Sequence, residues 1–185
     1  MGQEPGDEEL MLRAAAGDAD AFARVYHRHK EALLSFAYRM LRNWEDAADV
    51  SQQAFAYVHA HASTYRPSAK FATYLLHVAR NMCIDVLRRR KRWNLRQLDP
   101  EIDVPDEAPD RGSPLEREEV ETAIQKALEE VPEPYREVLH LRIARELPYE
   151  EIAQVVGCPV GTVKSRIHTG LALLRQALKR RRIAE

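Results

Sequence analysis

Hydrophobic residues recur every three or four positions through most of the chain, the period of amphipathic α-helices. One stripe consists of Ala47, Val50, Ala54 and Val58, and a second consists of Phe71, Leu75, Val78, Met82 and Val86. Both are typical of helix faces that pack into a core. No run alternates between apolar and polar residues for long enough to indicate a strand. The sequence therefore predicts an all-α protein.

The pattern breaks once, over residues 98–114. This segment is rich in proline and acidic residues and has no sustained period, which favours a flexible acidic linker. We therefore expect an N-terminal tail over 1–13, a first small helical domain over 14–97, and a second over 115–185. Asn43 and Ser68 are candidate N-cap residues in the first domain.

Near the C-terminus the pattern predicts two short helices joined by a tight turn. Pro148 suits a first helical turn, and Gly157 can adopt the left-handed conformation that ends a helix. The apolar positions of the second helix are Val163, Ile167, Leu171, Leu174 and Leu178. Its other face carries Thr162, Lys164, Ser165, Arg166 and His168, which can contact phosphates or base edges in a major groove. By periodicity alone, a DNA-recognition helix and an ordinary solvated helix both remain open.

Charge is segregated although the formal net charge is only −1. Residues 88–92 and 179–182 are basic blocks, whereas residues 99–121 are strongly acidic. Consecutive cations repel one another unless an anion neutralises them, and DNA phosphate is a natural partner. The charge pattern thus favours a nucleic-acid-binding protein.

Other functional classes lack the residues that they need. Cys83 and Cys158 stand far apart without zinc-ligand spacing, and each His-x-His pair would point to different sides of a helix. No nucleophile elbow or phosphate loop is present. We expect no enzyme activity, no metal site and no cofactor. The chain also lacks a membrane-spanning run or signal peptide, which predicts a cytoplasmic protein without membrane insertion.

Three motifs resemble those of bacterial sigma-70 family factors, especially the extracytoplasmic-function (ECF) group. Residues 159–166, Pro-Val-Gly-Thr-Val-Lys-Ser-Arg, follow a Tyr-Glu-Glu-Ile-Ala helix as in sigma region 4. Residues 45–55 are similar to region 2.2, and residues 63–92 are similar to regions 2.3 and 2.4. The resemblance extends from about Ala14 to Arg182 with the motifs in the family's order.

This resemblance implies a dissociable subunit that directs promoter-specific initiation by core RNA polymerase. The residues implied to face polymerase, at its β′ clamp, are Asp46, Asp49, Gln52, Gln53 and Phe55. Those implied to contact a melted minus-ten element are Tyr65, Arg66, Ser68, Lys70, Arg80, Asn81, Arg88, Arg89 and Lys91. Those implied to read a duplex minus-thirty-five element are Thr162, Lys164, Ser165, Arg166, His168 and Thr169.

The implied partners are core RNA polymerase through its β′ clamp and β subunits, promoter DNA, and an anti-sigma factor. After Arg166 the sequence leaves the common family pattern, which predicts a distinct minus-thirty-five motif. Gly170 is expected to weaken its helix by about 1 kcal/mol relative to alanine, although it could permit close packing. The alternative interpretation is a stand-alone helix-turn-helix regulator that binds duplex DNA without polymerase.

Overall fold

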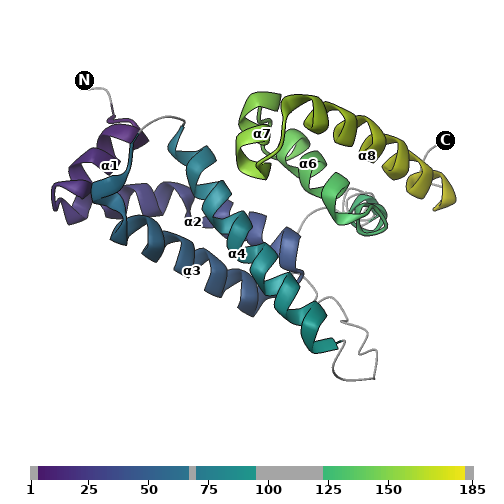
Figure 1. Ribbon diagram of the computed structural model, residues 1–185, viewed down its shortest axis with the longest axis horizontal. Helices are drawn as coiled ribbons and strands as arrows, with labels where there is room; N and C mark the ends of the chain where they lie inside the picture. The colour runs from purple at the N-terminus through teal and green to yellow at the C-terminus, as the bar shows by residue number, and fades with distance from the viewer. Residues whose placement is uncertain (1–3, 67–69, 95–122, 182–185) are drawn as a thin grey trace, which may run out of the picture. The chain divides into compact units, whose positions relative to one another are not determined.

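The computed structural model describes residues 4–66, 70–94 and 123–181, and every regular element within these ranges is a helix. The chain divides into two compact units, with the boundary inside residues 95–122 (Figure 1). The predicted all-α class with two helical domains is confirmed. The predicted linker over 98–114 lies outside the described residues.

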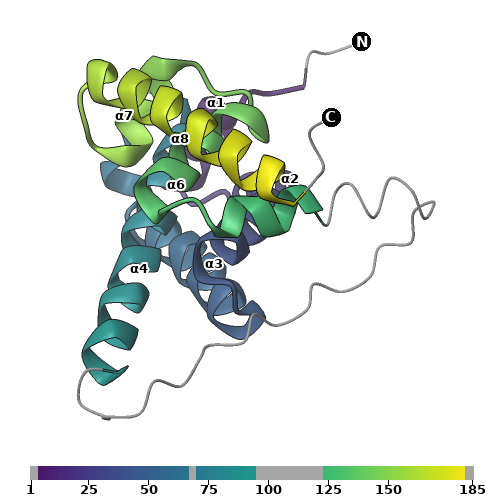
Figure 2. The same cartoon turned by 90° about the vertical axis from the view of Figure 1, so that its right-hand side faces the viewer.

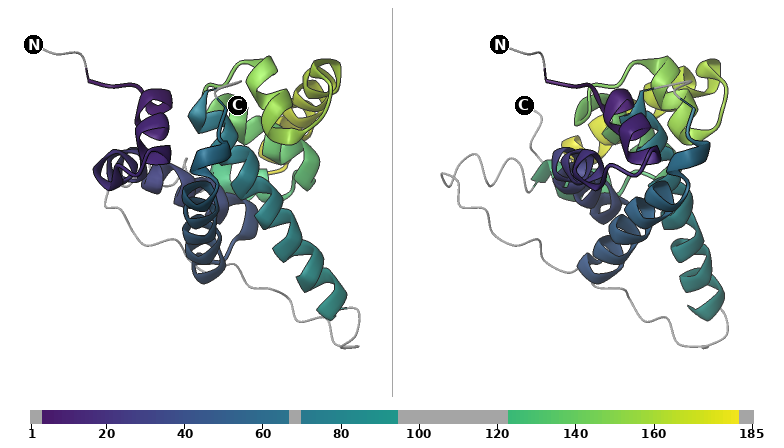
Figure 3. Two further views of the ribbon diagram at one scale, coloured as in Figure 1. Left: turned by 60° about the vertical axis from the view of Figure 1, so that its left-hand side comes forward. Right: turned by 90° about the vertical axis from the view of Figure 1, so that its left-hand side faces the viewer.

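The first unit is built around its second helix. Its elements are α1 (Asp7–Ala15), α2 (Ala19–Leu41), α3 (Trp44–Ala60), the short 3-10 helix η1 (Ala62–Thr64) and α4 (Phe71–Asn94). Helix α2 packs against α1, α3 and α4, and α3 also packs against α4 (Figure 3). All four α-helices of this unit therefore pack together.

Side-chain caps begin two of these helices. Asp18 accepts a hydrogen bond from the Ala21 amide at 3.0 Å, which starts α2. Asn43 accepts one from the Asp46 amide at 2.9 Å, as its sequence position predicted. Such caps satisfy amide groups that lack a partner inside the helix. The other predicted cap, Ser68, lies outside the described residues.

The N-terminal segment differs from the prediction. Residues 1–13 were expected to form a tail, but α1 begins at Asp7, and its Leu10 and Met11 side chains are completely buried. Three acidic residues in the first turn favour the helix dipole. The boundary at residue 14 is thus wrong, because burial of two large apolar side chains joins α1 to the first unit.

Most positions of the two predicted apolar stripes lie in the core. All four positions of the α3 stripe are buried, as are Phe71, Leu75 and Val78 of α4. Met82 and Val86 are partly exposed, while Cys83 is fully buried. The stripe on α4 therefore shifts toward Cys83 in its second half.

The second unit comprises a helical segment at 123–129, α6 (Glu133–Ile143), α7 (Tyr149–Val156) and α8 (Val160–Arg180). Helix α8 packs against both α6 and α7 (Figure 2). Gly157 has a φ of 70° and ends α7 in the left-handed conformation, as predicted. Helices α7 and α8 form the expected helix-turn-helix.

One position of the α8 stripe is wrong. Leu171 is 41% exposed, and the neighbouring Gly170 is buried instead. A Cβ atom added to Gly170 would lie 3.1 Å from Leu139 Cγ and 3.3 Å from Tyr135 Cβ, both on α6. Gly170 therefore permits the close packing that the sequence only suggested.

Two further observations concern the described residues alone. None of their helices has the length and apolar character needed to cross a membrane. Nor do these residues bring together three His, Cys, Asp or Glu side chains that could hold a metal ion.

Candidate polymerase and nucleic-acid interfaces

Helix α3 presents a polar face on the side opposite its core stripe. Asp49, Gln52 and Gln53 are exposed, whereas Ser51 is buried and donates a hydrogen bond to the Ala47 carbonyl at 2.8 Å. Short acids and amides at exposed positions suit a reversible polar interface with a basic partner. We call Asp49, Gln52 and Gln53 the α3 polar face.

Asp46 lies at the edge of this face but already has a partner within the chain. Its carboxylate forms an ion pair with Arg90 of α4. Arg90 also donates a hydrogen bond to the Leu41 carbonyl near the end of α2 at 2.9 Å. Arg90 thus links α2, α3 and α4, a role that the run of cations at 88–92 did not reveal.

Phe55 was expected on the polymerase-contacting face, but it is only 4% exposed. Its ring packs edge-on against Tyr26 of α2, with centroids 4.8 Å apart. Aromatic burial of this kind supports a core. Phe55 therefore holds α3 in place and does not belong to the exposed surface.

Tyr65 differs from its expected position in the same way. It is 7% exposed, with its ring centroid 6.0 Å from Phe71 and 5.6 Å from Tyr74. Burial, with smaller effects from the charges of Glu8 and Asp7, raises the pKa of Tyr65 to about 12. Its buried hydroxyl has no hydrogen-bond partner within the described chain. Tyr65 is a core residue.

The residues that flank 67–69 are accessible. Lys70 and Arg66 are exposed, and Arg66 donates to the Tyr65 carbonyl at 3.0 Å. Ser68 itself lies outside the described residues. Two cations therefore stand just before the first turn of α4.

The middle of α4 carries one exposed amide and one half-buried cation. Asn81 is exposed, with its Nδ2 atom 3.1 Å from His77 Nε2 one turn earlier. Arg80 is half-buried. The contact with His77 orients the Asn81 amide, which can both donate to and accept from a base edge.

The C-terminal end of α4 is a basic surface. Arg88, Arg89, Lys91 and Arg92 are exposed, and Arg88 lies 3.6 Å from Asp85 in a weak surface pair. Among the contacts between described residues, Arg90 is the member of this block that pairs with another helix, through Asp46. The remaining four cations form what we call the α4 basic end.

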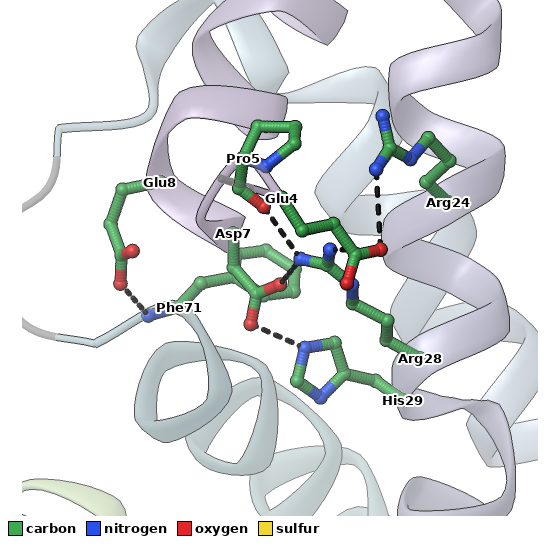
Figure 4. Close-up of polar contacts among 8 residues, drawn as sticks. All are labelled: Glu4, Pro5, Asp7, Glu8, Arg24, Arg28, His29 and Phe71. Atoms are coloured by element: carbon green, nitrogen blue, oxygen red, sulfur yellow. Dashed lines mark hydrogen bonds and ion pairs between the residues drawn. The ribbon is translucent and has the colours of Figure 1, made fainter. Parts of the chain in front are cut away.

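A polar network at the start of the chain was missed by the sequence reasoning (Figure 4). Asp7 lies 2.9 Å from Arg28 and 2.7 Å from His29 of α2, and Glu4 also pairs with Arg28. The neighbouring Glu8 accepts a hydrogen bond from the Phe71 amide of α4 at 3.1 Å. Pro5 and Gly6 before three acidic residues, followed by Leu10 and Met11, were a helix-start signal that could have revealed α1.

Helix α8 separates its buried and exposed faces cleanly. Val163 and Ile167 are buried, and the residues of the predicted DNA face are exposed or half-buried. The exposed members are Lys164, Ser165, His168 and Thr169, and the half-buried members are Thr162 and Arg166. The structure thus brings all six predicted residues onto the N-terminal half of one helix.

Helix α7 supports one of these residues. The Lys164 ammonium lies 5.8 Å from the centroid of the Tyr149 ring, and the Arg142 guanidinium lies 5.2 Å from the same ring. Cation–π contacts of this length are attractive. Tyr149, at the start of α7, therefore contacts one cation of α6 and one of α8.

Comparison with known proteins matches these two units separately. The family model "Sigma-70 region 2" matches residues 25–93, and "Sigma-70, region 4" matches residues 121–174. The two matches follow the order of the units along the chain.

Among curated proteins, the chain is similar to "ECF RNA polymerase sigma factor SigW" of Bacillus subtilis (strain 168). The two are 32% identical over 179 residues, which cover 88% of this chain and 91% of SigW.

Among solved structures, the fold is similar to RpoE from Bartonella quintana in complex with the anti-sigma factor NepR, with a TM-score of 0.74 at 24% identity. That likeness covers 85% of this chain and 96% of RpoE. CnrH in complex with the cytosolic domain of CnrY has a TM-score of 0.70 at 24% identity, covering 94% and 97%. At this identity the likeness concerns the fold.

The motifs, the helix-turn-helix and the two regional matches agree with one another. The chain therefore belongs to the sigma-70 family, in its extracytoplasmic-function group, and is a promoter-directing initiation factor of RNA polymerase with no enzymatic role.

Proposed function

We propose that the first unit binds core RNA polymerase and reads a melted minus-ten element, and that the second unit reads a duplex minus-thirty-five element. The observation that carries this division is the arrangement of exposed polar groups. Helix α3 of the first unit offers acids and amides, α4 ends in four exposed cations, and α8 of the second unit collects six exposed or half-buried polar residues in its N-terminal half.

The proposed polymerase contact is the α3 polar face, with the β′ clamp as its partner and the β subunit as a second contact. Asp49, Gln52 and Gln53 can meet a basic helix through reversible polar contacts. Asp46 is shared with Arg90 inside the fold, so a clamp cation must compete with Arg90 for it. Phe55 is left out of this surface because it is buried.

The proposed minus-ten surface runs along α4. Arg66, Lys70 and the α4 basic end supply cations for single-strand phosphates, and Asn81 supplies a base-edge donor and acceptor. Arg80 stays in this set as a half-buried cation. Tyr65 is left out of the direct contacts because its side chain is buried.

The proposed minus-thirty-five reader is the N-terminal half of α8 in a major groove. A recognition helix of a helix-turn-helix places its first residues against base edges. Lys164 and Arg166 are the cations of this surface, with His168 one turn beyond Lys164. A good bidentate base contact contributes about 1–3 kcal/mol of discrimination.

Control by an anti-sigma factor fits the same surfaces. The solved structures that resemble this fold include RpoE bound to the anti-sigma factor NepR. A partner that covers the α3 polar face would block access to polymerase. We place the protein in the cytoplasm, where it would meet polymerase and DNA.

The test reconstitutes holoenzyme with the wild-type chain, Asn81→Ala or Arg166→Ala, and measures transcription from promoters randomised at each element. Arg175→Ala, an exposed cation farther along α8, is the matched control. We expect Asn81→Ala to reduce minus-ten discrimination and open-complex formation, and Arg166→Ala to reduce minus-thirty-five discrimination about fivefold or more. Identical promoter profiles for both variants contradict the proposal, and duplex binding without any polymerase association would support a stand-alone regulator.

A further inference from the structure

Helix α1 reaches across the first unit to the start of α4. The Glu8 Oε1 atom accepts a hydrogen bond from the Phe71 amide at 3.1 Å, across 63 residues of sequence. Phe71 is the first residue of α4, so its amide is among those without a partner inside the helix. A carboxylate there also interacts favourably with the helix dipole. Glu8 thus caps α4 from another helix.

The position of Glu8 is set by its neighbours in sequence. Asp7 contacts both Arg28 and His29 of α2, and Arg28 donates a further hydrogen bond to the Pro5 carbonyl at 2.9 Å. Burial of Leu10 and Met11 adds an apolar attachment. Because these contacts hold α1 on both sides of Glu8, its carboxylate is presented to α4 by a supported helix (Figure 4).

Tyr65, the residue just before Arg66, also lies beside the first turn of α4. Tyr65 packs against Phe71 and Tyr74, so the two residues flanking segment 66–70 touch in the core. Arg66 and Lys70 are two cations of the proposed minus-ten surface, and each is directly bonded in sequence to one of these two residues. A change in the first turn of α4 would therefore shift Lys70, which is bonded to it, and would disturb the ring contacts of Tyr65, the residue before Arg66.

We propose that Glu8 is a positioning residue for minus-ten recognition, holding the first turn of α4 so that Arg66, Lys70 and the α4 surface meet the promoter strand in one fixed geometry. The inference rests on the proposed function, since it assumes that α4 reads the minus-ten element. It adds a residue from α1 that lies outside the regional match beginning at residue 25.

The neighbouring Glu9 provides a matched control. It lies on the same helix and has the same charge, but it is exposed, whereas Glu8 is half-buried. Substitution of either residue removes one negative charge from the first turn of α1. Of these two residues, Glu8 is the one that caps α4, so the two substitutions separate capping from charge.

The experiment compares holoenzymes carrying wild type, Glu8→Ala, Glu8→Gln and Glu9→Ala. Three quantities are measured: minus-ten discrimination on a randomised promoter library, minus-thirty-five discrimination on the matching library, and affinity for core polymerase. We expect Glu8→Ala to lose several-fold to about tenfold in minus-ten discrimination, the range that loss of a helix cap allows. Glu8→Gln, whose amide oxygen can still accept the hydrogen bond, should recover part of it. Glu9→Ala should match wild type.

Selective loss at the minus-ten element, with core affinity and minus-thirty-five discrimination kept, supports the inference. Unchanged minus-ten discrimination in Glu8→Ala, an equal loss at both elements, or an equal loss in Glu9→Ala overturns it. If Glu8→Ala does not fold, Glu8→Gln decides: a partial loss supports the inference and wild-type discrimination overturns it. A wild-type holoenzyme without minus-ten preference would instead refute the proposed function.

Discussion

Gly170→Ala tests whether close packing or helix propensity governs the contact between α8 and α6. Judged by propensity alone, alanine should stabilise the interior of α8 by about 1 kcal/mol. The structure opposes this gain, because the added Cβ would lie 3.1 Å from Leu139 Cδ1 and Cγ and 3.3 Å from Tyr135 Cβ. These distances are tighter than ordinary van der Waals contacts, so α6 or its side chains must move.

The size of the effect follows from two opposing contributions. Extra methyl groups in a packed core typically cost about 1–3 kcal/mol. Leu139 is 1% exposed and has little space to retreat, which places the cost in the upper half of that range. Subtracting the propensity gain leaves an expected net destabilisation of the second unit of about 1–2 kcal/mol.

The assay must report on the second unit alone. Both tryptophans, Trp44 and Trp93, belong to the first unit, so tryptophan fluorescence does not report on unfolding of the second unit. Native-state hydrogen exchange of α6 and α8 amides measures local free energies of opening. An increase of about fivefold in exchange corresponds to a destabilisation of about 1 kcal/mol.

Gly161→Ala is the matched control on the same helix. No atom of the described residues lies within 4 Å of a Cβ placed there, so the propensity gain remains without a packing cost. We expect slower exchange in Gly161→Ala and faster exchange in Gly170→Ala. Slower exchange in both variants would show that α6 can move to accommodate the added methyl group without loss of stability. That result would refute the prediction that close packing at Gly170 outweighs helix propensity.

Two further predictions concern ion pairs of the first unit. Arg90→Ala removes the contacts to Asp46 and the Leu41 carbonyl. It should lower the free energy of unfolding by about 1–2 kcal/mol, measured by tryptophan fluorescence in urea. The exposed Arg92→Ala should change this free energy little, and equal effects of the two substitutions would contradict the role of Arg90 in linking α2, α3 and α4. Asp7→Asn tests the contacts of Asp7 with Arg28 and His29. In the wild-type protein, burial raises the pKa of Asp7, but hydrogen bonds and charges from Arg28 and His29 lower this pKa overall. A lowered pKa contributes stability above the unfolded value of about 3.9 that is lost as the pH falls through the folded value. The deficit of Asp7→Asn in urea unfolding should therefore be largest near neutral pH and shrink below about pH 4; a deficit that does not vary with pH would contradict it.

The helices and their ends were largely predictable because their signals are local. The Asn43 cap, the left-handed Gly157 and the apolar stripe of α3 depend on residues within one or two turns. Helix α1 was missed although its start signal was present, because a short helix has no clear apolar period of its own. Its assignment required the elements against which α1 packs, chiefly α2 and η1.

The candidate sites were less predictable. Surface position followed from periodicity for Asp49 and Lys164, which are exposed as expected. Phe55 and Tyr65 were placed on contact surfaces by resemblance, whereas their rings are buried. Large aromatic side chains gain much free energy when they are buried. Whether a neighbouring helix leaves space to bury them cannot be read from the local sequence.

Short-range patterns and the order of the motifs were enough to predict the all-α class, the two helical units, the helix-turn-helix and the family. Tertiary structure alone decided which charges remain for partners. Arg90 meets Asp46 across 44 residues and Glu8 meets Phe71 across 63, so neither contact has a periodic signal. Gly170 is the same case for packing: its lack of a side chain is a weakness in an isolated helix and a requirement where α6 lies against it.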